Sequence, residues 1–408
     1  MTVPCRVAST SGVEPSRAKL PSIGGIYIHF PFCRRRCHYC DFNTYAVLAI
    51  PVEEYTSAII RELETRAESM AHIEISSVFL GGGTPGLWGA DPVRRVLECV
   101  RAHYRVTPTA EITIEVNPGE CGVDLLRAYR DVSGCNRVSF GVQSLSDKLL
   151  AAMDRLHSAD QARQALQDAD RAGFRRYSAD LMFGLPGQSL KRWVKDVREI
   201  ASMGLSHVSL YNLMVEPNTP LYLRVRDNKV RLPREKLQVE MLEQGFFHLA
   251  EFGLTRYEIS NFAKPGQESV HNLHYWQGRP YLGVGAGAHS FVAAANHNSP
   301  DAVGIRTSNV RKFGEYMKSV QADGTAIAFS EEISPLTHLR ERLMTGLRLI
   351  RGVDLDDVKQ ATGIDPRVPF GPVISSLVSA GLVQYDNNTL SLSEHAIPIS
   401  DSVFARFF

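Results

Sequence analysis

IYIHFPFCRRRCHYCDFN, residues 26–43, begins with an apolar run typical of a β-strand and continues with three cysteines within eight residues. Cys33, Cys37 and Cys40 have the spacing C-x₃-C-x₂-C. Thiols this close together are readily oxidised unless a metal occupies them. Disulfides would leave one of the three unpaired, so a metal centre is the better interpretation.

Two kinds of metal centre are compatible with these three thiolates. A structural zinc site takes four protein ligands, and only His38 could readily complete such a set, although it lies between two of the cysteines in the sequence. A [4Fe–4S] cluster is held by cysteine thiolates, and three of them leave one iron free to bind a small molecule. The ligand number favours the cluster, with zinc as the alternative.

The C-x₃-C-x₂-C motif directly after a strand resembles the radical S-adenosylmethionine (SAM) superfamily. In that superfamily the amine and carboxylate of SAM bind the open iron, so the resemblance implies a [4Fe–4S] cluster and SAM as cofactors. The flanking residues resemble the HemN/HemW branch, which contains the oxygen-independent coproporphyrinogen III oxidase and the heme chaperone HemW. The resemblance covers residues 26–290, most of the chain.

Six short β-like runs alternate with amphipathic helical stretches between residues 26 and 213. The predicted strands are Ile26–Phe30, Ser77–Gly81, Ile112–Val116, Arg137–Val142, Ser178–Phe183 and Val208–Leu213. Among the helices, Asp91 is the predicted N-cap of one, while Ser158 begins another that Gly173 ends. Such alternation predicts an α/β fold with a parallel sheet and right-handed crossovers. The family resemblance likewise implies a partial (βα)₆ barrel.

Polar or glycine residues mark the carboxyl ends of these strands, where parallel α/β proteins place their binding sites. Three consecutive glycines, residues 81–83, predict a backbone that approaches a ligand closely and offers its amide groups. Glu115, Gln143 and Asp180 stand at the ends of the third, fourth and fifth strands. Each could be a structural hydrogen-bonding residue, but their joint positions predict a shared pocket.

The resemblance also implies roles for individual residues. Tyr27, Gly82 and Glu115 match positions of the branch that contact cluster-bound SAM. Positions around a second SAM site of the oxidase are matched by Tyr39, Gly83, Thr84, Gln143, Arg155, Asp180 and Met214. The Met214 match depends on alignment through a diverged loop.

The segment HNLHYW, residues 271–276, places His271 and His274 beside two aromatic residues. Imidazole is a common axial ligand of heme iron, and aromatic rings can cover a macrocycle. Hydrogen-bonded packing residues are the commoner interpretation of such histidines from chemistry alone. The HNxxYW motif resembles one tied to heme binding in the branch, which implies heme ligation by His271 or His274.

The chain is predicted to divide into a flexible tail (1–22), the partial barrel (23–220), an extension with the HNxxYW motif (221–329) and a small C-terminal domain (330–408). Three helical stretches and a hairpin around residues 386–388 give the last domain a winged-helix-like pattern. It carries six Lys/Arg against seven Asp/Glu over residues 335–394, so binding to nucleic acid is not expected. A packing or protein-docking role is the better hypothesis.

Composition is that of an ordinary globular protein, with 408 residues and a formal net charge of +1. The sequence has no run of about 18 apolar residues, so no transmembrane helix is predicted. The four scattered cysteines Cys5, Cys99, Cys121 and Cys135 are interpreted as packing residues. Free thiols and an oxygen-sensitive site indicate the cytoplasm, whereas organelle targeting by residues 1–22 is the less favoured alternative.

Two functions follow from the resemblance. The first is a heme chaperone that binds heme and transfers it to an acceptor protein, with an electron donor such as a flavodoxin or ferredoxin serving the cluster. The alternative is the oxidase, which converts coproporphyrinogen III to protoporphyrinogen IX. The oxidase signature has a fourth cysteine where this chain has Phe42. That difference and the HNLHYW segment favour the chaperone.

Overall fold

The computed structural model describes residues 20–293 and 302–408. Most of the tail predicted for residues 1–22, together with Cys5, therefore lies outside the described residues. No helix in the described ranges is long and apolar enough to cross a membrane.

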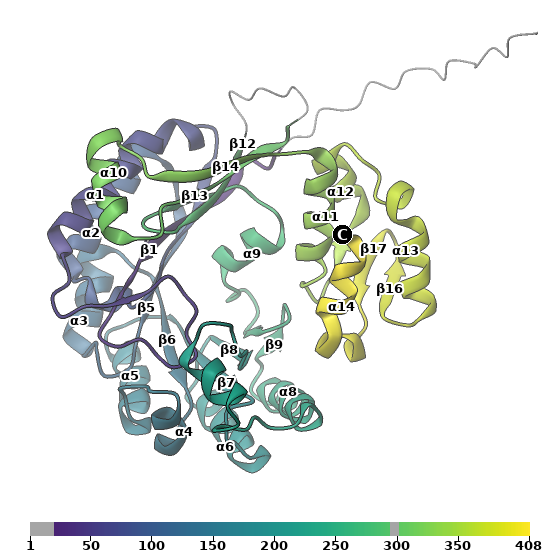
Figure 1. Ribbon diagram of the computed structural model, residues 1–408, viewed down its shortest axis with the longest axis horizontal. Helices are drawn as coiled ribbons and strands as arrows, with labels where there is room; N and C mark the ends of the chain where they lie inside the picture. Colours follow the sequence, from purple (N-terminus) through teal and green to yellow (C-terminus); the bar gives the residue numbers. More distant parts are fainter. Residues whose placement is uncertain (1–19, 294–301) are drawn as a thin grey trace, which may run out of the picture.

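Six parallel strands form the centre of one curved sheet (Figure 1). They are β1 (Ile23–Phe30), β4 (Glu74–Gly82), β5 (Arg105–Val116), β6 (Arg137–Gln143), β7 (Arg176–Phe183) and β8 (His207–Asn212). Each pairs in parallel register with the next along the chain. The six predicted strands and the partial barrel are confirmed.

Helices between these strands cover the outer face of the sheet. They are α1 (Val52–Arg66), α2 (Ala90–His103), α3 (Val123–Ala128), α4 (Asp147–Ala152), α5 (Ala159–Arg171) and α6 (Leu190–Ser202), with the short helices η1 (Ala67–Met70), η2 (Pro85–Leu87) and η3 (Tyr129–Ser133). Ser158 caps α5 with a full capping box, as the sequence predicts. The N-cap prediction for Asp91 is wrong. Gly89, with a φ of 94°, caps α2, so Asp91 lies in the first turn and pairs with Arg94.

The sheet is wider than predicted, with twelve strands among the described residues. β11 (Tyr281–Val284) runs parallel to β1 on its other side, and β12 (His289–Ala293), β13 (Gly304–Asn309) and β14 (Ile327–Ile333) continue from it antiparallel. β10 (Asn261–Ala263) and β9 (Thr255–Arg256) extend the opposite edge, while β2 (Phe32–Cys33) and β3 (Tyr45–Ala46) pair separately. Strands of the predicted extension belong to the same sheet as the partial barrel. The domain boundaries at residues 220 and 329 stay predictions.

Helix α9 (Val270–Trp276) lies inside the curve of the sheet (Figure 1). Its place depends on Gly25 of β1, because a Cβ there would lie 2.6 Å from Ser77 Oγ and 3.2 Å from the His271 ring. Helices α7 (Pro220–Arg226) and α8 (Glu235–Ala250) follow β8, and α10 (Phe313–Asp323) connects β13 to β14. The HNLHYW segment therefore forms a helix inside the partial barrel, packed on β1 and β4.

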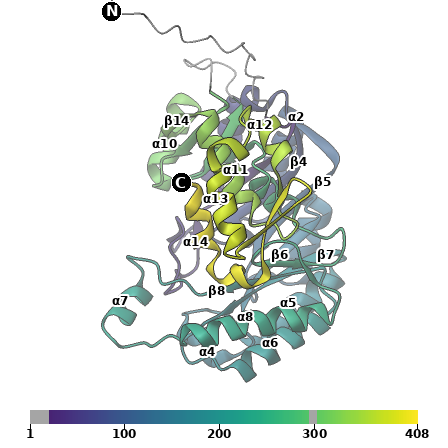
Figure 2. The ribbon, with the colours of Figure 1, turned by 90° about the vertical axis from the view of Figure 1, so that its right-hand side faces the viewer.

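The C-terminal region forms a second layer across the open side of the sheet (Figures 1 and 2). It contains α11 (Pro335–Gly346), α12 (Leu355–Thr362), α13 (Arg367–Ser379), α14 (Ser400–Phe404), η4 (Glu394–Ile399), η5 (Ala405–Phe407) and the strands β15 (Val353–Asp354), β16 (Val383–Asp386) and β17 (Thr389–Leu392). Asn387 and Asn388, both with positive φ, make the two-residue turn of the predicted hairpin. Leu339, Leu343 and Leu377 belong to a core of its own.

Candidate functional site

The three clustered cysteines lie at the carboxyl edge of the parallel sheet, directly after β1. They line a cavity of 140 Å³ into which the ends of β4, β5, β6 and β7 project. Eight of the residues proposed for SAM also line it: Tyr39, Gly82, Gly83, Thr84, Glu115, Gln143, Arg155 and Asp180. The strand ends therefore meet in one pocket, as the sequence predicts.

Two of the proposed SAM residues lie elsewhere. Tyr27 lines an adjoining cavity of 670 Å³, which shares Gly82 and Glu115 with the first. Met214 lines neither cavity, and the residue is 63% exposed. Its role at a SAM site stays a prediction that this geometry does not support.

The cysteine sulfurs are held by side chains of several elements. Thr84 donates a hydrogen bond to Cys33 Sγ at 3.5 Å, and Arg155 donates one to Cys37 Sγ at 3.5 Å. Burial raises the pKa of the Cys33 thiol to about 11. Loading of a metal centre onto these thiolates is therefore coupled to proton release.

His38 does not complete a four-ligand set. Its ring lies 3.7 Å from Asp154 and 3.4 Å from Arg224, and it is not among the residues that line the cysteine cavity. His38 therefore does not supply the fourth ligand that the zinc alternative needs.

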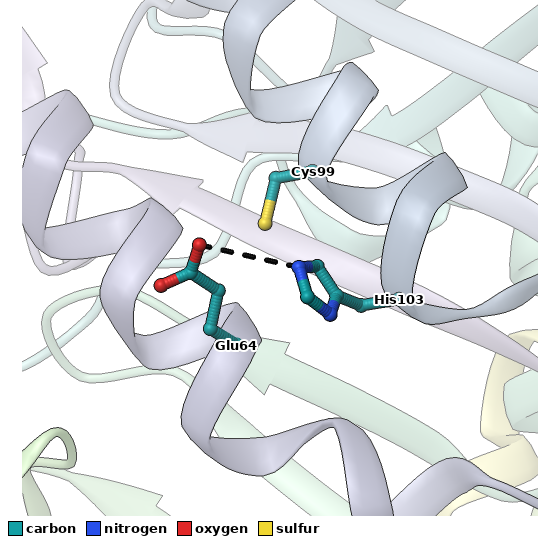
Figure 3. Close-up of side chains that lie close together, drawn as sticks. All are labelled: Glu64, Cys99 and His103. Atoms are coloured by element: carbon teal, nitrogen blue, oxygen red, sulfur yellow. Dashed lines mark ion pairs between the residues drawn. The ribbon is translucent and has the colours of Figure 1, made fainter.

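The spacing of the sulfurs is compatible with a cluster. A tetrahedral zinc with Zn–S bonds of about 2.3 Å holds its sulfurs about 3.8 Å apart. Among the described residues, the one group of three such ligand atoms within 4.8 Å of one another is Glu64, Cys99 and His103, on the outer helices α1 and α2 (Figure 3). The sulfurs of Cys33, Cys37 and Cys40 are thus more widely spaced, which suits thiolates bound to different irons of one cluster.

The glycine run has a different role from the predicted one. The amides of Gly83 and Thr84 donate to the carbonyls of Phe30 and Phe32, and the Gly82 amide donates to Glu115 at 3.0 Å. A Cβ on Gly83 would lie 2.6 Å from the Phe32 carbonyl oxygen. The close approach is therefore to the strand that carries the cysteine loop, so these amides are not free for a ligand.

Arg155 organises the polar wall of the cavity. Besides Cys37, it donates to Asn117 Oδ1 and to the Gly141 carbonyl, each at 2.7 Å. Asn117 in turn donates to Thr84 at 2.9 Å. Sequence reasoning missed Asn117, although its position two residues after Glu115 at the same strand end could have indicated it. The buried Nε of Arg155 has no partner among the described residues, so the wall keeps one donor for a ligand.

Two partly buried carboxyl groups face this region. Burial, and then the charge of Asp180, raises the pKa of Glu115 from 4.5 to about 7, and burial raises the pKa of Asp180 from 3.8 to about 6. A cationic group in the cavity would stabilise their charged forms. The sulfonium and amine of SAM are such groups, so the donor set and the carboxyl pair both fit the expected cofactors.

The histidines of α9 are buried and hydrogen-bonded. His271 shares hydrogen bonds with Ser77 at 2.9 Å and Tyr275 at 3.1 Å, and His274 shares one with Ser76 at 2.8 Å. Burial lowers the pKa of His271 to about 3 and that of His274 to about 4, so both rings are neutral. These contacts anchor α9 on β4. Nδ1 of His274 is without a partner in the described part of the chain, and heme ligation by either residue stays a prediction.

Comparison with known proteins gives a consistent picture. The family model of the radical SAM superfamily matches residues 27–200, and that of the HemN C-terminal domain matches residues 333–399. The heme chaperone HemW of Bacillus subtilis is 32% identical over 382 residues, covering 93% of this chain and 98% of the relative. HemW of Escherichia coli is 32% identical over 95% of this chain and 99% of its own length.

A mitochondrial relative and a solved structure extend the comparison. The radical S-adenosyl methionine domain-containing protein 1 of Bos taurus, named as mitochondrial, is 34% identical over 98% of this chain and 90% of its own. The structure of coproporphyrinogen III oxidase (HemN) from Escherichia coli superposes with a TM-score of 0.79 at 21% identity, over 97% of this chain and 91% of the oxidase. At that identity the likeness shows a shared fold.

Proposed function

Since this chain belongs to the radical SAM superfamily as a HemW-like member, we propose that it binds heme and transfers it to an acceptor protein. The observation that carries the proposal is the identity of about a third, over nearly the whole chain, to proteins named heme chaperones. The heme acceptor is a protein, and its identity is left to experiment.

Membership of the superfamily implies a [4Fe–4S] cluster and SAM, and the cavity residues fit both. Cys33, Cys37 and Cys40 would hold the cluster, with Thr84 and Arg155 donating hydrogen bonds to two of the sulfurs. Glu115, which accepts from the Gly82 amide and lines the cavity, would bind a cationic group of SAM. When bound, the cluster would supply one-electron chemistry to SAM. The chain's part is to bind and orient SAM and to exclude water.

The alternative function is the oxidase reaction, the SAM-dependent conversion of coproporphyrinogen III to protoporphyrinogen IX. Phe42 stands where the oxidase signature has its fourth cysteine, and its side chain is 63% exposed at the mouth of the cysteine cavity. An apolar ring there cannot supply a thiolate, which favours the chaperone.

Two measurements on one anaerobic preparation separate these functions. Hemin added to the cluster-loaded protein should give a Soret band that saturates near one equivalent. Incubation with SAM, a reductant and coproporphyrinogen III should give no protoporphyrinogen IX. Product formation at enzymatic rates would replace the chaperone by the oxidase.

The identity of the heme ligand is a separate proposal. A His271→Ala, His274→Ala double variant should lose the Soret band if α9 ligates the iron. Ligation would require a ring to leave its serine partner, or His274 to use its free Nδ1. An unchanged band in the double variant would reject both histidines as ligands and leave them as anchors of α9.

Partners and compartment follow from the same proposal. A reduced flavodoxin or ferredoxin is the class of donor that could serve the cluster. Free thiols at Cys99, Cys121 and Cys135 suit a reducing compartment, for which we propose the cytoplasm. A relative named as mitochondrial makes the mitochondrion the other compartment to test.

A further inference from the structure

A cavity of 450 Å³ lies between α9, the start of β11 and helix α11 of the C-terminal layer. Its apolar lining includes Tyr275, Trp276, Tyr281 and Phe291. A second cavity, of 590 Å³, adjoins it and shares Trp276, Arg279 and Arg342. The two together form an aromatic-lined space with arginines at their junction, distinct from the cysteine cavity.

The two arginines at the junction make no direct ion pair, although Asp357 lines the larger cavity and its charge acts on Arg342. Among the described residues, neither the Arg279 nor the Arg342 guanidinium makes a hydrogen bond or an ion pair, and Nε and Nη1 of Arg342 are buried. Burial lowers the pKa of Arg342 to about 10, and burial also lowers that of Arg279. Desolvated guanidinium groups that lack an acceptor are costly, which an anionic ligand would relieve.

Two neighbouring arginines have acidic partners. Arg306 donates to both oxygens of Glu341 at 2.7 Å and to Glu331 at 2.9 Å. Arg348 lies 4.3 Å from the centre of the Trp276 ring and 3.7 Å from Glu258. Arg306, which lines the same cavity, is therefore paired with two carboxylates, whereas Arg279 and Arg342 contact none.

Resting on the proposed function, we propose that the 450 Å³ cavity is the heme site. Arg279 and Arg342, at its junction with the larger cavity, would bind the two propionates. Heme is a flat, largely apolar molecule with two carboxylates on one edge, which matches an aromatic-lined space with two unpaired guanidinium groups at one end. Guanidinium groups bind carboxylates through charge-assisted, often bidentate hydrogen bonds. The cavity volume lies in the range usual for small-molecule sites.

In this site His271 and His274 anchor α9 and do not ligate the iron, because neither lines either cavity. His271 and His274 fix the helix on β4, and its last turn presents Tyr275 and Trp276 to the cavity. Tyr275 and Tyr281 pack edge to face, with ring centres 4.7 Å apart, and both also line the 670 Å³ cavity beside Glu115. These two rings separate the proposed heme site from the space that adjoins the cysteine cavity.

The test compares hemin with its dimethyl ester, which keeps the macrocycle and lacks the carboxylates. Each is titrated into the full-length, cluster-loaded protein and followed by the Soret band. Wild type should bind hemin at least tenfold more tightly than the ester. An Arg279→Gln, Arg342→Gln variant should lose about tenfold in hemin affinity for each arginine and bind both compounds alike. Arg226→Gln, at an exposed guanidinium of α7, is the charge-matched control and should behave as wild type.

The outcomes separate this inference from the proposed function. If wild type binds neither compound, the proposed function fails. If wild type binds hemin and the ester equally, the arginine assignment is overturned while heme binding stands, and this arm needs no variant to fold. The assignment is equally overturned if the double variant, with unchanged circular dichroism and iron content, keeps the wild-type preference for hemin. A partial recovery in Arg279→Lys, Arg342→Lys would support carboxylate binding.

Discussion

Replacement of Glu115 by glutamine should stabilise the apoprotein at high pH but much less at low pH. Burial, and then Asp180, raises the pKa of Glu115 from 4.5 to about 7 in the folded chain. Between these values the folded protein binds a proton that the unfolded chain has released, so stability falls as pH rises through the interval. A shift of this size corresponds to about 3 kcal/mol, most of it lost between pH 5 and pH 8. Glutamine stays neutral and can still accept from the Gly82 amide.

The assay is urea unfolding of the metal-free protein at pH 5 and pH 8, followed by circular dichroism. The free energy of unfolding of the variant minus that of wild type should be larger at pH 8 by about 2–3 kcal/mol. Using this difference removes any packing effect that is independent of pH. Glu243→Gln, on the exposed side of α8, is the matched control and should show no such change. The same difference at both pH values would refute the reasoning that Glu115 is buried without a counter-charge.

Three further outcomes are expected. In the cluster-loaded protein, SAM affinity measured by equilibrium dialysis should rise about tenfold from pH 6 to pH 8, because a cationic ligand favours ionised Glu115, and should be flat in Glu115→Gln; a flat wild-type profile would argue against this contact. Arg137→Ala should cost about 3 kcal/mol in urea unfolding, because buried Glu111 loses its nearer arginine, at 3.2 Å, and keeps only Arg176 at 3.6 Å. The exposed-pair variant Arg127→Ala should cost at most about 1 kcal/mol, and similar losses in both would contradict this. Ser158→Ala should cost about 1 kcal/mol through loss of the α5 capping box, and an unchanged unfolding midpoint would count against that role.

Much of the fold and of the cysteine cavity could be predicted because it depends on local pattern and on one general rule. The period of apolar residues marks the six parallel strands, and parallel strands bring their carboxyl ends to one edge. Cys33, Glu115 and Asp180 meet there for that reason. Met214 follows β8 in the sequence but points to solvent, because a loop position does not fix a side-chain direction.

The remainder depends on contacts between distant parts of the chain, which local pattern does not encode. Among the strands β11 to β14 only β11 runs parallel, so the strand–helix alternation that indicates parallel strands does not mark them. The amides after β4 are taken by Phe30 and Phe32, a pairing that the glycine run alone cannot indicate. Arg279 and Arg342 come together only when the C-terminal layer packs over α9.

The central claim is that Cys33, Cys37 and Cys40 hold a [4Fe–4S] cluster whose open iron binds SAM. Anaerobic reconstitution followed by iron and sulfide analysis, with electron paramagnetic resonance of the reduced protein before and after SAM addition, tests it most directly. Four irons and four sulfides per chain are expected, with a spectrum that changes on addition of SAM and a loss of cluster in Cys40→Ala. Protein that binds only zinc, or a cluster spectrum that SAM leaves unchanged, would contradict the claim.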